Sequence, residues 1–167
     1  MQERAEALAN IKTELRESVA KLLITEGVVR PDPVFHLSLE HYIPDFEGNL
    51  LATERLVNLP EWQKSKRIFI TPDRSTQLLR EVAIMQKKEI VVTTYGICRG
   101  AVLLRGDMVS EGQEAFAASL DGMERIGNPL RTIKEIKKAG KIDLMVTGAL
   151  AISEAHGGRT GKGAGWF

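Results

Sequence analysis

The sequence predicts an α/β fold with an open, mostly parallel sheet and flanking helices. Short apolar runs that suit buried strands alternate with longer amphipathic segments, and glycine or proline separates many of them. The 167 residues contain 43% apolar and 27% charged side chains, which is typical of one globular domain. We therefore expect residues 1–167 to form a single domain.

The first predicted element is an amphipathic helix over residues 2–26, which ends before Gly27. Apolar side chains recur along it at intervals of three and four residues, and we expect this stripe to pack on the sheet. The stripe consists of Leu8, Ile11, Leu15, Val19 and Leu22. Lys12 and Arg16 share one face beside the stripe, where the spacing alone favours a solvated charge pair.

Strands and helices are expected to alternate along the rest of the chain. Prolines break residues 31–48 into a loop with room for a short strand at 34–39. Helices are expected at 50–59, 75–88 and 130–139, the last of them closed by Gly140. Strands are expected at 67–71, 89–94, 101–104 and 144–146, and residues 149–152 continue the last strand region. Residues 105–128 stay unassigned.

The helix over residues 75–88 follows a predicted strand directly. We expect Ser75 to cap its N-terminus. Its inward face is expected to consist of Leu78, Val82 and Met85. Asp73, before the helix, suits the positive end of the helix dipole, and Arg80 is interpreted as a solvated cation.

Charge and cysteine content limit the class of protein. The formal net charge is +1, so the chain lacks the general basic field of most nucleic-acid-binding proteins. Cys98 is the single cysteine, which fits a reducing compartment, and we expect it to be a small buried residue. The N-terminus lacks the apolar core of a signal peptide, and no apolar stretch suits a membrane span. We expect a cytoplasmic protein with neither nucleic acid nor membrane as partner.

The last eleven residues, GGRTGKGAGWF, are the strongest candidate for a ligand site. Gly161, Gly163 and Gly165 alternate, so that backbone N–H groups can approach an anion, and Arg159 and Lys162 supply positive charge. The segment follows an expected strand, and ligands of α/β sheets bind beyond strand carboxyl ends. Neither the P-loop nor the dinucleotide-binding pattern fits. The residues alone leave a phosphate site and a flexible tail as alternatives.

The order of residues in this segment resembles the 5-formyltetrahydrofolate cyclo-ligase (methenyltetrahydrofolate synthetase) family. Residues 158–167 are similar to the nucleotide loop of the family, and the strand from Asp143 is similar to the strand before that loop. KTELR at 12–16 resembles the basic pair on the first helix of the family. YIPDFEGNLLATERL and ITPDRSTQLLR are most similar to a divergent, cyclo-ligase-like branch. The resemblance implies the fold shared by sugar-phosphate isomerases and CoA transferases.

The resemblance implies an ATP-dependent cyclisation of 5-formyltetrahydrofolate to 5,10-methenyltetrahydrofolate with release of ADP and phosphate, or a closely related reaction. A reduced folate would be the substrate and Mg²⁺ the metal. In the route implied, the formyl oxygen attacks the γ-phosphate of ATP, and N10 then displaces the phosphorylated oxygen. Such catalysis relies on positioning and charge stabilisation. A non-catalytic module that binds a nucleotide or another phosphate ligand is the alternative. Isomerase or CoA-transferase chemistry would need a catalytic carboxylate that the sequence does not reveal.

The resemblance also implies roles for individual residues. The expected ATP-binding residues are Lys12, Arg16, Gly158, Arg159, Gly161, Lys162, Gly163 and Gly165. Arg159 and Lys162 would act in catalysis, and Glu47 and Trp166 would contact the folate. His156 is interpreted from the sequence as a loop histidine, with contact to a ligand as the alternative. Members of the family continue past the glycine segment with further strands and a magnesium-binding Asp. We therefore expect the chain to lack the C-terminal part of the domain and to hold no metal ligand, which leaves its own activity open.

Overall fold

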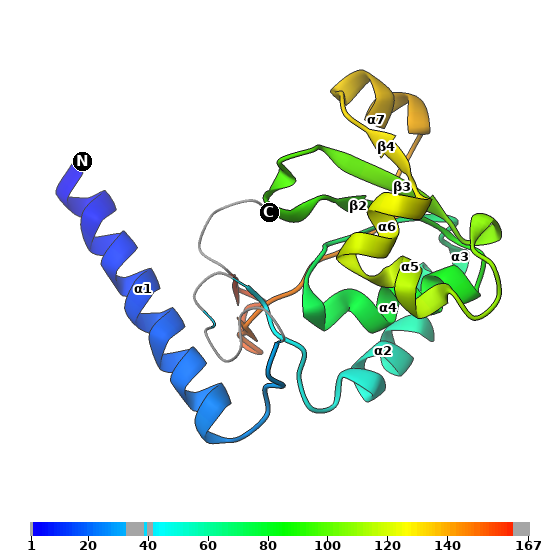
Figure 1. Cartoon of the computed structure of the whole chain (residues 1–167). Coiled ribbons are helices and arrows are strands. Elements are labelled where there is room, and N and C mark those ends of the chain that lie inside the picture. Colours follow the sequence, from blue (N-terminus) through cyan, green and yellow to red (C-terminus); the bar gives the residue numbers. More distant parts are fainter. Residues whose placement is uncertain (1, 33–38, 40–41, 162–167) are drawn as a thin grey trace. The chain divides into compact units, whose positions relative to one another are not determined.

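A computed structural model describes residues 2–32, 39 and 42–161 of the chain (Figure 1). The chain divides into two compact units. Unit 1 combines residues 1–47 with residues 148–167, and unit 2 is the continuous segment 48–147. The expected strand at 34–39 lies almost entirely outside the described residues. The single-domain organisation stays a prediction.

Unit 2 is built on a five-stranded sheet with the order β4-β3-β2-β1-β5. The strands are β1 (Arg67–Ile70), β2 (Glu89–Thr93), β3 (Ala101–Arg105), β4 (Asn128–Leu130) and β5 (Leu144–Val146). β1 pairs in parallel with β2 and β5, whereas β3 is antiparallel to both β2 and β4. Four of the five strands therefore run in the same direction. This arrangement confirms the predicted α/β fold with an open, mostly parallel sheet.

β3 runs against β2 because the link between them is too short for the crossover that a parallel pair requires. The chain reverses through three residues with positive φ, namely Gly96 (59°), Ile97 (58°) and Gly100 (81°). A Cβ at Gly100 would overlap the carbonyl of Leu130, so this position requires glycine. Cys98 lies in this short, outward link and is exposed, so the expectation that it is buried was wrong.

Helices cover both faces of the sheet. They are α2 (Asn49–Val57), α3 (Pro60–Lys64), α4 (Gln77–Met85), α5 (Glu114–Ala118), α6 (Leu120–Ile126) and α7 (Ile133–Ala139). Short 3-10 turns occur at η1 (Arg74–Thr76), η2 (Tyr95–Ile97) and η3 (Gly106–Met108). On one face, Ile68, Ile70 and Ile90 of the sheet pack with residues of α3 to α6. On the other face, Phe69 and Val91 pack in a smaller cluster that includes Ala139 of α7.

α7 follows from local sequence signals. Thr132 and Glu135 form a reciprocal capping box at its N-terminus, and Gly140 ends it with a φ of 103°. The backbone N–H groups of Arg131 and Thr132 donate to the Glu135 carboxylate and lower its pKa. The predicted end of this helix is confirmed, although the helix starts later than expected because 128–130 form β4.

The buried face of α4 differs from the predicted one. Leu79, Ala83 and Ile84 are buried, whereas Met85 is 60% exposed. The predicted inward residues Leu78 and Val82 are half-buried. Leu79 and Ala83, each one residue after a predicted position, pack in the core together with Ile84, whereas Gln86, which follows Met85, is exposed. Thr76 rather than Ser75 precedes the helix, and its hydroxyl donates to the Thr71 carbonyl (2.7 Å) instead of capping the helix.

Unit 1 contains one long helix and a small hairpin. The helix α1 (Gln2–Thr25) confirms the predicted N-terminal helix, and β6 (Ala151–Ile152) pairs with β7 (Arg159–Thr160). The core of unit 1 consists of Val29, Leu39, Tyr42, Ile43 and Leu150, packed against Val19, Ala20 and Leu23 of α1.

The predicted apolar stripe of α1 is not buried. Leu8, Ile11, Leu15 and Leu22 are between 51% and 60% exposed. The helix instead contributes Val19, Ala20 and Leu23 near its C-terminal end, and only Val19 belongs to the predicted stripe. Periodicity identifies an apolar face, but the few apolar residues of this core cover only a short part of the helix.

Candidate functional site

Arg159, the most specific cation of the glycine segment, lies in a hairpin strand. It begins β7 and pairs with Ile152, and the Leu150 N–H donates to the Thr160 carbonyl (2.8 Å) next to this pairing. The sheet strand β5 ends at Val146. The expectation that the glycine segment directly follows a strand of the main sheet was therefore wrong, because a separate two-stranded hairpin comes between them. Arg159 itself is exposed.

The hairpin loop is closed by backbone bonds and by His156. The Ser153 N–H donates to the Gly158 carbonyl (2.8 Å), and the Gly157 N–H donates to the Ser153 carbonyl (2.9 Å). The Gly158 N–H donates to Nδ1 of His156 (3.2 Å). Because Nδ1 accepts this bond, the neutral ring carries its proton on Nε2, which lies 3.2 Å from Ser153 Oγ. His156 thus occupies the Gly158 N–H that was expected to face a phosphate.

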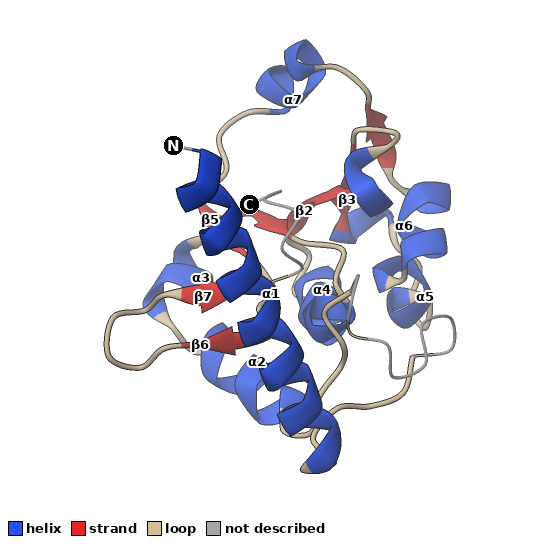
Figure 2. Cartoon of the chain, turned by 90° about the vertical axis from the view of Figure 1, so that its left-hand side faces the viewer, coloured by secondary structure: helices blue, strands red, loops and turns tan. Residues whose placement is uncertain are grey.

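The start of the glycine segment lies on the same apolar cluster as α1. A Cβ built at Gly161 would lie 4.0 Å from Cδ1 of Ile43, which packs with Ala20 and Leu23 in the unit 1 core. Arg16 lies one turn before Ala20 on the same helical face and is half-buried. Lys12 lies one further turn away and is exposed. Figure 2 shows the hairpin beside α1 within this unit.

Glu47, the predicted folate contact, is held by a cation that sequence reasoning missed. Nη2 of Arg30 donates to Oε2 of Glu47 (3.1 Å), and Nη1 donates to Oδ2 of Asp45 (3.4 Å). The hydrogen bond to Glu47 is the largest cause that raises the pKa of Arg30. The isolated pairing of Val29 with Phe46 aligns the two segments. Such a single bridge leaves no periodic signal in the sequence.

The remaining predicted site residues, Lys162, Gly163, Gly165 and Trp166, lie outside the described residues. Within 2–32, 39 and 42–161, no three His, Cys, Asp or Glu side chains gather in a way that could hold a metal ion. None of the helices in this part of the chain has the length and apolarity needed to cross a membrane.

Unit 2 places a buried arginine where β1 ends. Arg80 is 1% exposed, which corrects its interpretation as a solvated cation. Its Nη1 donates to the carbonyls of Thr71 (2.6 Å) and Asp73 (3.1 Å), and its Nε donates to the Ala118 carbonyl (2.9 Å). Burial lowers the pKa of Arg80 to about 10, and the Asp73 charge opposes this shift. Arg80 therefore fixes the loop at the carboxyl end of β1, where α/β sheets commonly bind ligands.

Comparison with known proteins identifies relatives that cover most of the chain. Residues 9–167 match the model of the 5-formyltetrahydrofolate cyclo-ligase family. A human methenyltetrahydrofolate synthase domain-containing protein is 25% identical over 93% of this chain and 39% of its own length. A zebrafish (Danio rerio) protein of the same name is 24% identical over 79% of this chain and 34% of its own length. The chain thus spans well under half of either relative. Because the family match covers nearly every residue, the chain belongs to the 5-formyltetrahydrofolate cyclo-ligase family.

Proposed function

We propose that the chain carries an ATP-dependent cyclo-ligase site that converts 5-formyltetrahydrofolate to 5,10-methenyltetrahydrofolate, or performs a closely related ATP-dependent reaction. The observation that carries the proposal is the family match, which includes both the basic pair on α1 and the terminal glycine segment. The substrate would be a reduced folate, and the products would be the cyclised folate, ADP and phosphate. The site would operate in the cytoplasm, without nucleic acid or membrane as partner.

The geometry of unit 1 supports a phosphate site. Arg16 lies on the face of α1 that packs into the apolar core, and Gly161 lies against Ile43 of the same core. Arg159 is exposed in β7, so its guanidinium is accessible to a phosphate. Residues from the two ends of the sequence therefore come together in one compact unit. This supports the assignment of ATP phosphates to Lys12, Arg16 and the glycine segment after Gly158, whose own N–H is bonded to His156.

Each predicted residue has a distinct task in this reaction. When the formyl oxygen attacks the γ-phosphate, negative charge develops on the transferred group, and Arg159 and Lys162 would stabilise it. Lys12 and Arg16 would hold the remaining phosphates. Glu47 would orient the folate and is itself oriented by Arg30.

The donor set suits a nucleotide whose metal ion is carried mainly by phosphate oxygens. The described part of the site offers cations and backbone N–H groups rather than clustered carboxylates. A Mg²⁺ ion bound together with ATP would neutralise part of the phosphate charge.

ATP binding is the first of two measurements that test the proposal. Titration calorimetry with ATP and Mg²⁺ should show binding that weakens about tenfold in Arg16→Ala, because one phosphate contact is lost. Arg55→Ala, on α2 of unit 2, is the matched control and should bind as the wild type does. Equal affinity in Arg16→Ala and wild type would contradict the assigned site.

Product formation separates the leading proposal from its alternative. Absorbance of the methenyl product should rise in the presence of ATP and 5-formyltetrahydrofolate and should fall strongly in Arg159→Ala. ATP binding that depends on Arg16 without any turnover would support the non-catalytic nucleotide-binding module instead. No ATP binding at all would contradict both.

A further inference from the structure

A basic pocket lies at the edge of the unit 2 sheet where the parallel strands β1, β2 and β5 begin. Its volume is about 680 Å³, and residues 63–67, 86–89, 141 and 143 line it. Six of the lining residues are cations, namely Lys64, Lys66, Arg67, Lys87, Lys88 and Lys141. The two lining carboxylates are Glu89 and Asp143. The lining therefore carries a formal surplus of four positive charges.

Both carboxylates already have positive partners or donors of their own. Nε of Arg67 donates to Oε2 of Glu89 (2.8 Å), and the Arg67 guanidinium forms an ion pair with the same carboxylate. Oδ2 of Asp143 accepts the backbone N–H groups of Lys66 (2.9 Å) and Arg67 (3.0 Å), which lower the pKa of Asp143. Glu89 thus offsets Arg67, and Asp143 joins β5 to the start of β1. Within the described residues, neither carboxylate lies within ion-pair distance of a pocket lysine, although the charge of Lys141 also favours the ionised form of Asp143.

The pocket lysines differ in whether their ammonium groups form hydrogen bonds within the protein. Nζ of Lys88 donates to the carbonyls of Trp62 (3.0 Å) and Ser65 (2.7 Å), and its pKa is lowered by burial. Lys87 donates to the Gly106 carbonyl (3.3 Å). In contrast, Lys64, Lys66 and Lys141 are exposed and form no side-chain hydrogen bond or ion pair within the described part of the chain. These three lysines are available to an anion.

The floor of the pocket is fixed by packing and hydrogen bonds. Trp62 does not line the pocket and is fully buried, and its Nε1 donates to Oε1 of the lining residue Gln86 (2.8 Å). Lys88 lies 5.5 Å from the centre of the Trp62 ring and ties the end of α3 to the start of β2. The segments that present the lysines are therefore positioned before any ligand arrives, which lowers the entropy cost of binding.

We propose that this pocket binds a small, multiply charged anion that bears phosphate groups. Lysine ammonium groups act as point charges that suit phosphate oxygens, and the pocket has the size of small-molecule sites. Trp62 is fully buried and offers no surface on which nucleic-acid bases could stack, so a single-stranded nucleic acid is disfavoured. All lining residues belong to unit 2, whereas the residues assigned to ATP belong to unit 1. The pocket and the proposed cyclo-ligase site thus share no residue.

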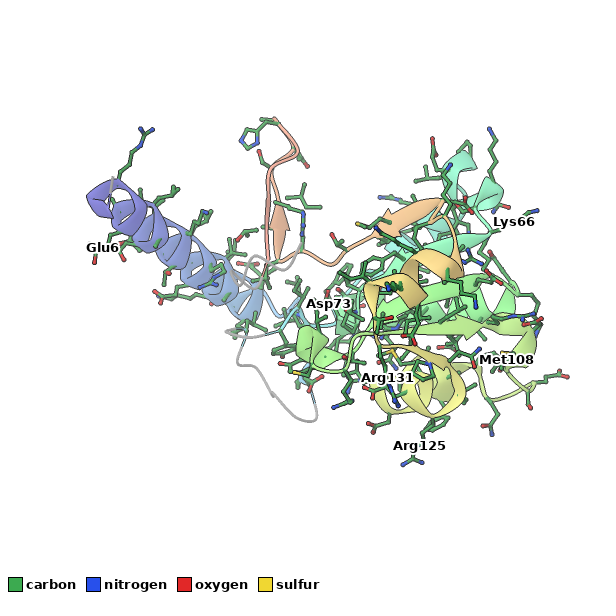
Figure 3. All side chains as sticks on the ribbon, turned by 90° about the horizontal axis from the view of Figure 1, so that it is seen from above. Glu6, Lys66, Asp73, Met108, Arg125 and Arg131 are labelled. Carbon is green, nitrogen blue, oxygen red and sulfur yellow. The ribbon has the colours of Figure 1, made fainter. Side chains whose placement is uncertain are left out.

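Calorimetric titration of the 167-residue chain with inorganic tripolyphosphate at low salt tests the proposal. The key variant replaces Lys64, Lys66 and Lys141 by Gln, which leaves the backbone donor of residue 66 to Asp143 in place. We expect the lysine variant to bind tripolyphosphate at the pocket about tenfold more weakly than the wild type. We also expect the affinity of the wild type to fall as the salt concentration rises, because salt screens the lysine charges. A control variant replaces Arg55, Arg125 and Lys134 by Gln and removes equal charge elsewhere on unit 2. Lys66 and Arg125 are labelled on opposite sides of unit 2 in Figure 3.

A second variant, Arg16→Ala/Arg159→Ala, removes the predicted nucleotide contacts of unit 1. Tripolyphosphate binding that survives in this variant and is lost in the lysine variant supports the pocket. Binding that is unchanged in the lysine variant, or equally weakened in the charge-matched control, overturns the proposal. The proposal is also overturned if single-stranded RNA binds these lysines with a higher affinity per phosphate group than tripolyphosphate does. Unfolding midpoints of all variants establish that each one is folded.

Discussion

Replacing Arg80 tests whether a buried cation holds the loop at the end of β1. Arg80→Met keeps much of the apolar length but removes four hydrogen bonds, to Thr71, Asp73, Thr76 and Ala118. The Thr76 hydroxyl has one proton and would still donate it to the Thr71 carbonyl, and the Asp73 carbonyl would still accept the backbone N–H of Thr76 (3.2 Å). The Ala118 carbonyl would lose its side-chain donor, which costs about 1–3 kcal/mol when buried. Removing the cation that offsets buried Asp73 adds to this loss, and relief of Arg80 desolvation opposes it.

We therefore expect Arg80→Met to lower the free energy of unfolding by about 2–4 kcal/mol, with Arg80→Ala near 5 kcal/mol because it also leaves a cavity. Urea unfolding followed by circular dichroism measures both, and an unchanged m-value keeps the comparison valid. The folded pKa of Arg80 lies below its unfolded value, so its contribution to stability rises with pH only above about pH 10. A loss below about 0.5 kcal/mol in Arg80→Met would refute the structural role.

Three further variants probe other parts of the fold. Asp143→Asn should lower the unfolding midpoint at pH 7, and the difference should shrink on acidification. The carboxylate contributes fully above its unfolded pKa of about 3.9 and loses this contribution as pH falls through its lower folded pKa, so a pH-independent difference would contradict the bonds to Lys66 and Arg67. Leu15→Ala should change the unfolding free energy by about 0.5 kcal/mol or less, because Leu15 is 53% exposed; a loss above about 2 kcal/mol would show that the stripe is buried in solution. Gly122→Ala should destabilise the protein by about 2–3 kcal/mol in chemical denaturation, because its Cβ would overlap the Phe116 carbonyl; wild-type stability would mean that α5 and α6 can separate freely.

The sequence predicted four of the five sheet strands well, because β1, β2, β3 and β5 are short apolar runs bounded by polar or turn residues, whereas β4 (NPL) is not such a run and was missed. RIFI at 67–70 and EIVVT at 89–93 form β1 and β2 as expected, and Gly140 ends α7. The direction of β3 follows from the short link before it, a constraint that apolar patterning does not express.

The wrong predictions concern which side chains of a helix are buried. α4 buries Leu79 and Ile84, which pack in the core beside the sheet, rather than Leu78 and Val82. Arg80 is buried because carbonyls from α5 and the β1 loop converge on it, and such long-range bonds leave no local pattern.

In the candidate site, too, short sequence motifs could be recognised, whereas individual side-chain contacts could not be predicted. The glycine segment and the basic pair on α1 indicated the family, and the family match confirms that identification. The Arg30–Glu47 pair depends on the single bridge between Val29 and Phe46. The His156–Gly158 bond depends on one tight turn. Neither could be predicted from residue spacing.

The division of the chain into units also bears on the order in which it folds. Unit 2 is continuous, whereas the core of unit 1 joins Val29 to Leu150 across the whole of unit 2. Closing so long a loop in a disordered chain is entropically unfavourable, but prior compaction of unit 2 shortens the effective loop. Unit 2 should therefore fold first and restrict the ends of unit 1 to a smaller volume. In pulsed hydrogen exchange, amides of β2 should gain protection before the Leu150 amide does, and the reverse order would contradict this sequence of events.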